Sequence, residues 1–415
     1  MFKWFRFKNF QSYLDDCIVD LSVNKKVAHS YFDYELPDGS KISKILGVFG
    51  ANGSGKSNLI QPLAFISWFL GHSFQSLAEK DKIPYSPHFC TKDQNTEIEF
   101  EIAFVLPKQN ELPHDCLELK YFVEFNKSRV IREEMKVKTS RLFSNVFTRL
   151  YDPEKDRYII KKNAKYLPTP NATLEQAPHN CSLVSYLSRI NHDNKTDSFD
   201  LLSGISLLFE VNESNLNMLG RDNHFYNLGY ATQLFAENKA IFNNVKTLLK
   251  KYDLGLDDIE IEETTVISSD GEEESKLMPF CIHHNKGKPF RLPMHLESSG
   301  TQSAYRMLAS IALRLELGGI SILDEFDNDL HPQLTAEIIN LFKDQSTNPK
   351  NAQLIFTSHS PEILKLLRKQ HVYLTEKIDC ESQAWRADEI EGLKERDNLY
   401  AKYISGALGG VPSFD

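Results

Sequence analysis

The chain has 415 residues, 41% of them hydrophobic, and its 57 acidic and 48 basic side chains give a net charge of −9. This length predicts two or three domains, or one domain with insertions. The negative net charge argues against nucleic-acid binding by the surface as a whole, so any such contact would need a local basic patch. The six scattered cysteines form no C-x-x-C pair, which disfavours a disulfide or zinc framework and is typical of a cytoplasmic protein. No apolar stretch is long enough to span a bilayer, so we expect no membrane segment.

In chain order, the first clear pattern is a strand, a glycine-rich turn and a helix. Residues 2–7 alternate aromatic and basic side chains and predict a strand, and a second strand at 17–22 is expected to fold back on it. The apolar run 42–46 then leads into Gly50-Ala-Asn-Gly-Ser-Gly-Lys-Ser57, and an apolar helix follows at 58–70. The turn fits G-x-x-x-x-G-K-[ST], in which backbone amides and the helix N-terminus surround phosphate oxygens.

This turn predicts a nucleotide site that uses a magnesium ion. The ammonium group of Lys56 is expected to reach the β- and γ-phosphates, and the hydroxyl of Ser57 is expected to bind Mg²⁺. A coincidental glycine-rich turn is the alternative, and the strand before it and the helix after it argue against that. The ATP contacts predicted from this stretch are Asn52, Gly53, Gly55, Lys56, Ser57 and Asn58.

The middle of the chain changes its period. Alternation of apolar and polar residues over 96–161 predicts an antiparallel meander with one solvated face. Residues 201–255 have a mostly helical pattern, which is clearest at 236–252. The acidic stretches 257–263 and 270–274 are interpreted as solvated loops, the usual setting of charge runs.

Strand–helix alternation returns near residue 277 and predicts a parallel α/β sheet. The run Ile320-Ser-Ile-Leu-Asp324 reads as a buried strand that ends in a carboxylate, and Glu325 follows at once. Given the phosphate turn upstream, Asp324 is expected to hold Mg²⁺ and Glu325 to deprotonate the attacking water. Without that turn, both would more simply be exposed carboxylates. His359 ends the next apolar strand, where a histidine is more often structural, but beside Glu325 it is a candidate contact for the γ-phosphate.

Taken together, these motifs resemble the ATPase head of ABC-type proteins, in the branch of SMC, RecF and OLD-like proteins. In this resemblance, Glu297–Gln302 corresponds to the signature motif. The resemblance implies that Ser299, Gly300 and Gln302 of this signature contact ATP held by a second copy, so that ATP joins a homodimer or higher oligomer. A Q-loop glutamine cannot be placed, and the candidates are Gln75, Gln94 and Gln109. Besides the phosphate turn, the matching motifs are Lys8-Asn-Phe-Gln-Ser-Tyr13, Glu297-Ser-Ser-Gly-Thr-Gln302, Ile322-Leu-Asp-Glu325, Asn328-Asp-Leu-His331 and Thr357-Ser-His-Ser360.

A narrower likeness is to the compact ATPase subunits of bacterial anti-phage and abortive-infection systems, such as Septu, PARIS and AbiL-like systems. Leu330-His-Pro332, Ser358–Leu364 and Gly410-Val-Pro412 carry it. It implies a sensor or regulatory scaffold that acts with a separate effector, a nuclease or toxin, and responds to a phage protein or a nucleic acid. About forty residues follow the last predicted strand, too few for the nuclease domain of OLD-type proteins.

Two other functions stay open. A RecF/SMC-like DNA-binding ATPase in DNA repair would use basic clusters at 136–141, 161–165 and 246–251, although such clusters more often coat a solvated face. A scaffold that holds ATP without turnover is the other, and the presence of Glu325 and His359 argues against it.

The sequence therefore predicts an α/β fold, a P-loop NTPase of the ABC-head type, with an antiparallel β-lobe and a helical insertion. The expected division is an N-terminal ATPase lobe at 1–161, a helical insertion at 162–275, a C-terminal ATPase lobe at 276–380 and a tail at 381–415. The meander, the insertion and the tail are interpreted as the parts that contact a partner or a trigger.

Overall fold

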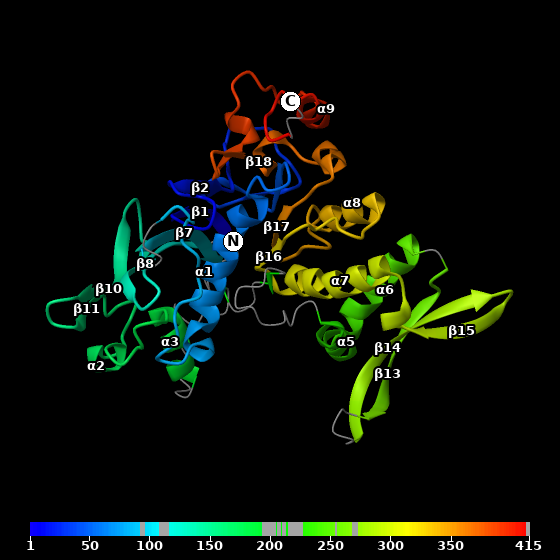
Figure 1. The fold of residues 1–415 in the computed structure, drawn as a ribbon, viewed down its shortest axis with the longest axis horizontal. Helices are drawn as coiled ribbons and strands as arrows, with labels where there is room; N and C mark the ends of the chain where they lie inside the picture. Colours follow the sequence, from blue (N-terminus) through cyan, green and yellow to red (C-terminus); the bar gives the residue numbers. More distant parts are fainter. Residues whose placement is uncertain are drawn as a thin grey trace.

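A central six-stranded sheet organises the fold in the computed structural model, which describes residues 1–91, 96–107, 116–192, 205, 209, 213–214, 227–253, 255–267 and 273–411 (Figure 1). All neighbouring strands in this sheet are parallel except the last pair. The three central strands are entirely buried, which is why they appear in the sequence as continuous apolar runs. In spatial order the strands are β12 (Glu213–Ser214), β16 (Ile320–Leu323), β17 (Gln353–Thr357), β6 (Ile45–Gly50), β18 (Val372–Ile378) and β19 (Glu381–Arg386).

The central sheet separates two hydrophobic cores. One face packs against α1 (Lys56–Ser76), which is buried on most of its surface, and against a second sheet. The other face packs against α7 (Ser299–Leu317) and α8 (Pro332–Leu341), which lie across β16 and β17 from α1 in Figure 1. Alternate residues of each strand point to opposite faces, so Ile355 belongs to the first core and Phe356 to the second.

The second sheet contains the predicted antiparallel meander, which is confirmed. Its five meander strands pair in sequence order, and β1 then extends the sheet by pairing with β7. The predicted hairpin of β1 and β2 is confirmed as well. In spatial order the strands are β11 (Arg157–Lys162), β10 (Phe143–Asp152), β9 (Val130–Lys138), β8 (Cys116–Phe125), β7 (Ile98–Pro107), β1 (Phe2–Lys8) and β2 (Cys17–Asp20).

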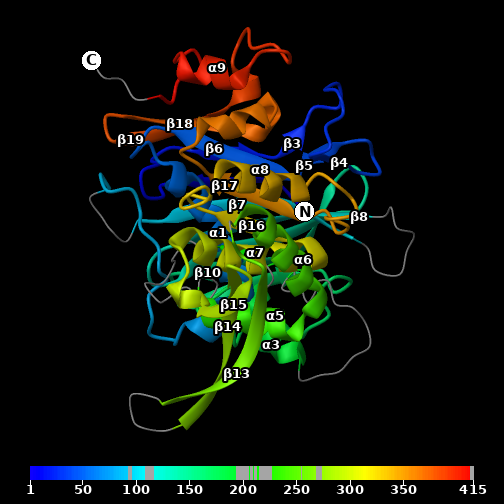
Figure 2. The ribbon, with the colours of Figure 1, turned by 90° about the vertical axis from the view of Figure 1, so that its right-hand side faces the viewer.

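A third unit lies on the far side of α7. Helices α5 (Leu228–Glu237) and α6 (Lys239–Tyr252) pack on α7 and confirm the helical pattern predicted for 236–252. A three-stranded sheet follows, and its first hairpin projects away from the helices in both ribbon views (Figures 1 and 2). Its strands are β13 (Asp258–Ile267), β14 (Glu273–Asn285) and β15 (Lys288–Pro293).

The remaining described elements are short. None of the helices in the described ranges combines the length and apolar character that a bilayer crossing requires. The short elements are β3 (Ser22–Val23), β4 (Asp33–Glu35), β5 (Lys41–Ser43), α2 (Asn171–Leu174), α3 (Leu183–His192), η2 (Met294–Leu296), η3 (Pro361–Lys365), η4 (Lys369–His371), η5 (Ala387–Glu389) and α9 (Leu399–Ile404).

One sequence interpretation is wrong in the described part of the chain. The acidic stretch 257–263 is not a solvated loop, because Ile259 and Ile261 alternate with the acidic residues and most of the stretch forms β13. The tail after residue 380 begins with β19, the last strand of the central sheet, and contains the short helix α9. Of the stretch 270–274, only Glu273 and Glu274 are described, and they lie in β14. Gln94 and Gln109, two of the Q-loop candidates, lie outside the described residues.

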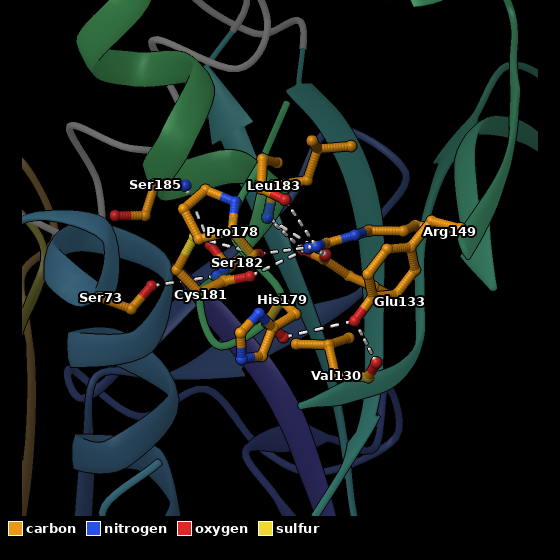
Figure 3. Close-up of polar contacts among 12 residues, drawn as sticks. Ser73, Val130, Glu133, Arg149, Pro178, His179, Cys181, Ser182, Leu183 and Ser185 are labelled. Atoms are coloured by element: carbon orange, nitrogen blue, oxygen red, sulfur yellow. Dashed lines mark hydrogen bonds and ion pairs between the residues drawn. The ribbon is translucent and has the colours of Figure 1, made fainter. Parts of the chain in front are cut away.

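A buried ion pair joins the meander to the segment before α3 (Figure 3). Arg149 Nη1 lies 3.5 Å from Glu133 Oε2, and both side chains are almost completely buried. Arg149 also donates to the carbonyls of Ala177, Pro178 and Cys181. Burial raises the pKa of Glu133, and the charge of Arg149 opposes that rise. These contacts hold β9 and β10 against residues 177–183, the segment that leads into α3. Helix α3 in turn packs on α1.

Candidate nucleotide site

The glycine-rich turn connects β6 to α1 and leaves open space where a ligand could approach its backbone. Gly53 and Gly55 have φ angles of 75° and 104°, a region that L side chains rarely adopt. A Cβ at Gly53 would meet nothing within 4 Å, whereas one at Gly50 would clash with Ser54 and Thr375. The glycines therefore serve two purposes, since Gly53 leaves the mouth open and Gly50 allows β18 to pack close behind the turn.

Lys56 begins α1 and its side chain folds back over the turn. It is only 6% exposed, and its Nζ donates to the carbonyls of Gly50 (3.0 Å) and Ala51 (3.1 Å). Burial lowers the pKa of this ammonium group, and the carboxylates of Asp324 and Glu325 partly offset the effect. The cation is thus held among weak carbonyl partners, which phosphate oxygens could replace with stronger charge-assisted hydrogen bonds.

The hydroxyl of Ser57 and the carboxylate of Asp324 meet although they are far apart in sequence. Ser57 Oγ donates to Asp324 Oδ1 at 2.9 Å, and Thr357 Oγ1 donates to the same oxygen at 2.5 Å. Thr357 can reach Asp324 because β17, which it ends, lies between β6 and β16 in the sheet. An alcohol and one carboxylate are hard oxygen donors, and Mg²⁺ typically takes one or two such groups from the protein and completes its shell with phosphate and water. The donor set therefore fits Mg²⁺.

Glu325 follows Asp324 in an unusual backbone conformation. Its φ is 49°, and its N–H donates to Thr357 Oγ1 at 2.7 Å. Its carboxylate accepts from Asn328 Nδ2 at 2.5 Å and lies 3.6 Å from His359 Nε2, which is an ion-pair distance. The side chains of Glu325 and His359 are 48% and 36% exposed. Glu325, directly after Asp324 in the chain, therefore presents a water-accessible carboxylate to His359.

The N-terminal motif and the tail support the turn from behind. Ser12 Oγ accepts from Asn58 Nδ2 and from Ser382 Oγ, each at 2.8 Å. A Cβ at Gly55 would clash with Ser382. A Cβ at Gly410 would lie 3.8 Å from Gly50 Cα, so the end of the described chain also reaches the turn. Asn58, predicted to contact ATP, is thus engaged with Ser12, and part of the tail is a structural neighbour of the turn.

The signature residues lie elsewhere on the chain. Ser299 begins α7, and the Ser298 side chain caps the helix by accepting from the Thr301 N–H. Gly300 packs against the loop after Glu325, where an added Cβ would lie 2.7 Å from Asp329 O. Gln302 donates to the carbonyl of Glu297 at 2.8 Å. Within the described residues, no hydrogen bond or ion pair joins Ser299, Gly300 or Gln302 to the glycine-rich turn.

Sequence reasoning assigned no individual role to Thr357, Ser382 or Tyr13. Thr357 bonds both carboxylate-bearing residues, Ser382 adjoins Gly55, and Tyr13 OH donates to Gly55 O at 3.2 Å. The signal available for Thr357 was its place at the end of an apolar strand, directly before Ser358 and His359. The sequence contains no comparable signal for Ser382, because its role depends on β19 joining the sheet.

The arrangement of the turn, its lysine and the strand-end carboxylates on a mostly parallel sheet defines a P-loop NTPase with a mixed α/β fold, which confirms the predicted fold class. The chain belongs to the family described as "AAA domain, putative AbiEii toxin, Type IV TA system", whose model matches residues 45–159 and 172–365. Among curated protein sequences, none matches this chain.

Several solved structures are similar to this chain at low identity. An Smc head bound to the C-winged helix domain of ScpA shares 12% identity over 92% of this chain and 96% of that chain, with a TM-score of 0.45. An SMC head domain from Thermotoga maritima shares 14% identity over 93% and 98%, with a TM-score of 0.39. An Smc head domain with a coiled coil and joint from Pyrococcus yayanosii shares 11% identity over 98% and 99%, with a TM-score of 0.43.

Proposed function

We propose that this chain binds ATP with Mg²⁺ and hydrolyses the ATP, and that bound ATP joins two copies head to head. The observation that carries this proposal is the convergence of groups at the ends of β6, β16 and β17. There Ser57 lies 2.9 Å from Asp324, and Glu325 lies 3.6 Å from His359, beside the glycine-rich turn. These groups form the set that a phosphoryl transfer to water requires.

Each group has a distinct part in the proposed reaction. The amides of the turn from Asn52 to Asn58 hold the phosphates, and the ammonium group of Lys56 neutralises their charge. Ser57 and Asp324 are the residues that would hold Mg²⁺, which supplies further charge stabilisation when bound. The carboxylate of Glu325 takes the proton of the attacking water, and His359 contacts the γ-phosphate.

The head-to-head arrangement follows from the position of the signature. Ser299, Gly300 and Gln302 lie in the first turn of a 19-residue helix, whose N-terminus favours anions. Because Gly300 packs against the loop at Asp329 and not against the turn of its own chain, we propose that a second copy supplies the phosphate that these residues would bind. In this proposal each site is incomplete in a monomer, and hydrolysis releases the pair.

We place this ATPase in bacterial anti-phage defence, with a separate nuclease or toxin as its effector and a phage protein or nucleic acid as its trigger. The family description, which names an abortive-infection toxin and a toxin–antitoxin system, supports this context. We propose that the lobes at 1–161 and 276–380 carry the ATP chemistry and that the insertion at 162–275 carries partner contacts. The tail at 381–415 contributes less to partner contacts in this proposal, because Ser382 and Gly410 adjoin the turn and so belong to the nucleotide site.

The alternative, a DNA-binding clamp, has less support. Several lysines of the basic clusters are paired with carboxylates: Lys136 with Glu134, Lys246 with Asp258 and Lys251 with Glu337. Paired lysines contribute little to a DNA-binding surface. DNA affinity depends on free lysine and arginine charges that neutralise phosphates and so release the counterions condensed on the DNA.

The nucleotide site is tested with Lys56→Ala. We expect this variant to lose tight ATP binding in calorimetry, because the ammonium group nearest the phosphates is removed. The matched control is Lys26→Ala at an exposed position, which should bind as the wild type does. Unchanged tight binding of ATP·Mg²⁺ by Lys56→Ala would sink the assignment.

The catalytic assignment and the dimer are tested with Glu325→Gln. The variant keeps the shape of the side chain but cannot accept a proton, so phosphate release should slow by a factor on the order of 10² or more. With ATP it should accumulate as dimers in light scattering, whereas the exposed control Glu395→Gln should turn over normally. Hydrolysis at the wild-type rate would move the base to another residue, and a monomer with ATP bound would contradict the head-to-head arrangement.

A further inference from the structure

The projecting hairpin of β13 and β14 has one side that the described strands leave unpaired. Strand β14 pairs with β13 over residues 273–282, but with β15 only over residues 280–285. The stretch 273–279 therefore has β13 on one side, and among the strands that the structure describes none pairs with its other side. An edge of this kind presents free N–H and C=O groups that can template another strand.

The register identifies which backbone groups face this open side. The β14–β15 hairpin turns at Lys286 and Gly287, whose φ angles are 51° and 77°, so Asn285 and Lys288 form the hydrogen-bonded pair that closes a two-residue loop. Hydrogen-bonded positions then recur at every second residue along β14. The N–H and C=O groups of Leu277 and Ser275 consequently point away from β13, as does the C=O of Pro279.

A groove runs along this open edge. It has a volume of about 450 Å³ and lies between residues 275–279 of β14 and the first turns of α5. Leu228 and Thr232 line it from the helix, and Leu277, which is 38% exposed, lines it from the strand. Five residues of a strand span roughly 16 Å, so the groove is long enough for a short extended segment.

The charge of the hairpin selects the occupant. Strands β13 and β14 carry six carboxylates against a single lysine, Lys276. Three of the carboxylates are paired, Asp258 with Lys246, Glu262 with Arg291 and Glu274 with Lys276. Glu260, Glu263 and Glu273 form no ion pair with another described residue, so the hairpin keeps a net negative charge. A second copy of this hairpin would be repelled by the first, and so would an acidic peptide. We propose that this edge binds an extended, basic segment of a partner protein, which adds a strand to β14 in the groove beside α5.

Docking here would reach the signature through a short path. His283 of β14 lies with Nε2 2.6 Å from Glu297 Oε1 and with Nδ1 2.7 Å from Gly255 O. Glu297 directly precedes Ser298, the cap of α7. A strand added to β14 would thus act on the sheet that contacts Glu297, two residues before α7 begins.

The test uses the full chain without nucleotide, so that failure of the ATPase proposal does not affect it. The probe is a fluorescein-labelled ten-residue peptide that alternates lysine and valine, followed by fluorescence polarisation. The same peptide with glutamate in place of lysine, and a version N-methylated on alternate amides, are the peptide controls. We expect saturable binding of the lysine peptide only, and at least about tenfold weaker binding after N-methylation, because the methyl groups block main-chain pairing.

Protein variants test the same edge from the other side. Leu277→Pro removes an N–H on the open side, where proline is compatible with an edge strand, and should weaken binding at least about tenfold, whereas Leu277→Val should not. Charge reversal at Glu263 and Glu273, which are exposed, should weaken binding similarly. Equal binding of the N-methylated peptide, preference for the glutamate peptide, or self-association of the chain that Leu277→Pro abolishes would each overturn the proposal.

Discussion

Thr357 offers the sharpest test of how the candidate site is held together. Its hydroxyl donates to Asp324 and accepts from the N–H of Glu325, so one oxygen bonds both carboxylate-bearing residues. Thr357→Val keeps the volume and branching of the side chain but removes both hydrogen bonds. It also leaves a partly buried N–H without its partner at Glu325, whose φ of 49° is already unfavourable for a residue with a side chain. We therefore expect the carboxylate of Glu325 to lose its fixed position.

The size of the effect follows from the hydrogen bonds that are lost. A hydrogen bond to a charged group is worth about 1.5–3 kcal/mol. If all of it is lost from the transition state, hydrolysis slows by roughly 10- to 150-fold. ATP affinity should change much less, because Lys56 and the amides of the turn are untouched. Thr357 would then be a positioning residue, recognised by a fall in kcat with KM nearly constant.

The assay is phosphate release at saturating ATP and Mg²⁺, paired with calorimetric ATP binding. Thr357→Ser restores the hydroxyl and should recover most of the rate. Thr232→Val controls for the loss of a buried threonine hydroxyl away from the turn, since Thr232 is fully buried and donates to Leu228 O at 2.6 Å. If Thr357→Val hydrolyses ATP at the wild-type rate while Glu325→Gln does not, the hydroxyl does not position Glu325 and the reasoning is refuted.

Two further predictions concern stability. Arg149→Met should lower the free energy of unfolding by about 3–5 kcal/mol in urea denaturation, because Glu133 would remain as an uncompensated buried charge. The double variant Arg149→Met/Glu133→Gln should lose less stability than the sum of the two single variants. Additive losses would contradict the coupling of the two residues. Burial lowers the pKa of His283, but its hydrogen bonds to Glu297 and to a backbone carbonyl outweigh burial and raise that pKa overall. The resulting stabilisation is complete below about pH 6.5 and is lost as pH rises through the folded pKa. Between pH 6 and 8, the thermal midpoint of the wild type should therefore fall more than that of His283→Gln, whereas the exposed control His29→Gln should behave as the wild type does. Equal pH slopes for the wild type and His283→Gln would remove His283 as the cause.

Local chemistry explains which parts of the fold could be predicted. The phosphate turn depends on glycines, a lysine and a hydroxyl within a few residues, and the meander depends on a period of two, so both are present in short windows of sequence. The interpretation of 257–263 was wrong because charge density was given more weight than the alternation of Ile259 and Ile261, which forms one face of β13. In that stretch the period was the better indicator.

The parts that could not be predicted depend on contacts between distant segments. Ser12, Gly55 and Ser382 meet only because β19 completes the central sheet and brings the tail to the turn. Thr357 lies near Asp324 only because β17 is inserted between β6 and β16. Neither strand order nor the place of the last strand is encoded in a local pattern, so no motif could predict these contacts.

The loop from Glu325 to His331 connects the two halves of the proposed mechanism. It begins at the proposed base, and its carbonyl at Asp329 lies so close to Gly300 that an added Cβ would be 2.7 Å away. Two of its residues, Glu325 and Asp329, have φ angles of 49° and 61°, so the loop has little freedom to relax around a displaced neighbour. If a second copy binds the signature helix and shifts Gly300, this loop would therefore move with Gly300, and the position of Glu325 would change as well. On this reasoning, dimerisation would complete the partner's site and also adjust the base of the chain that donates the signature.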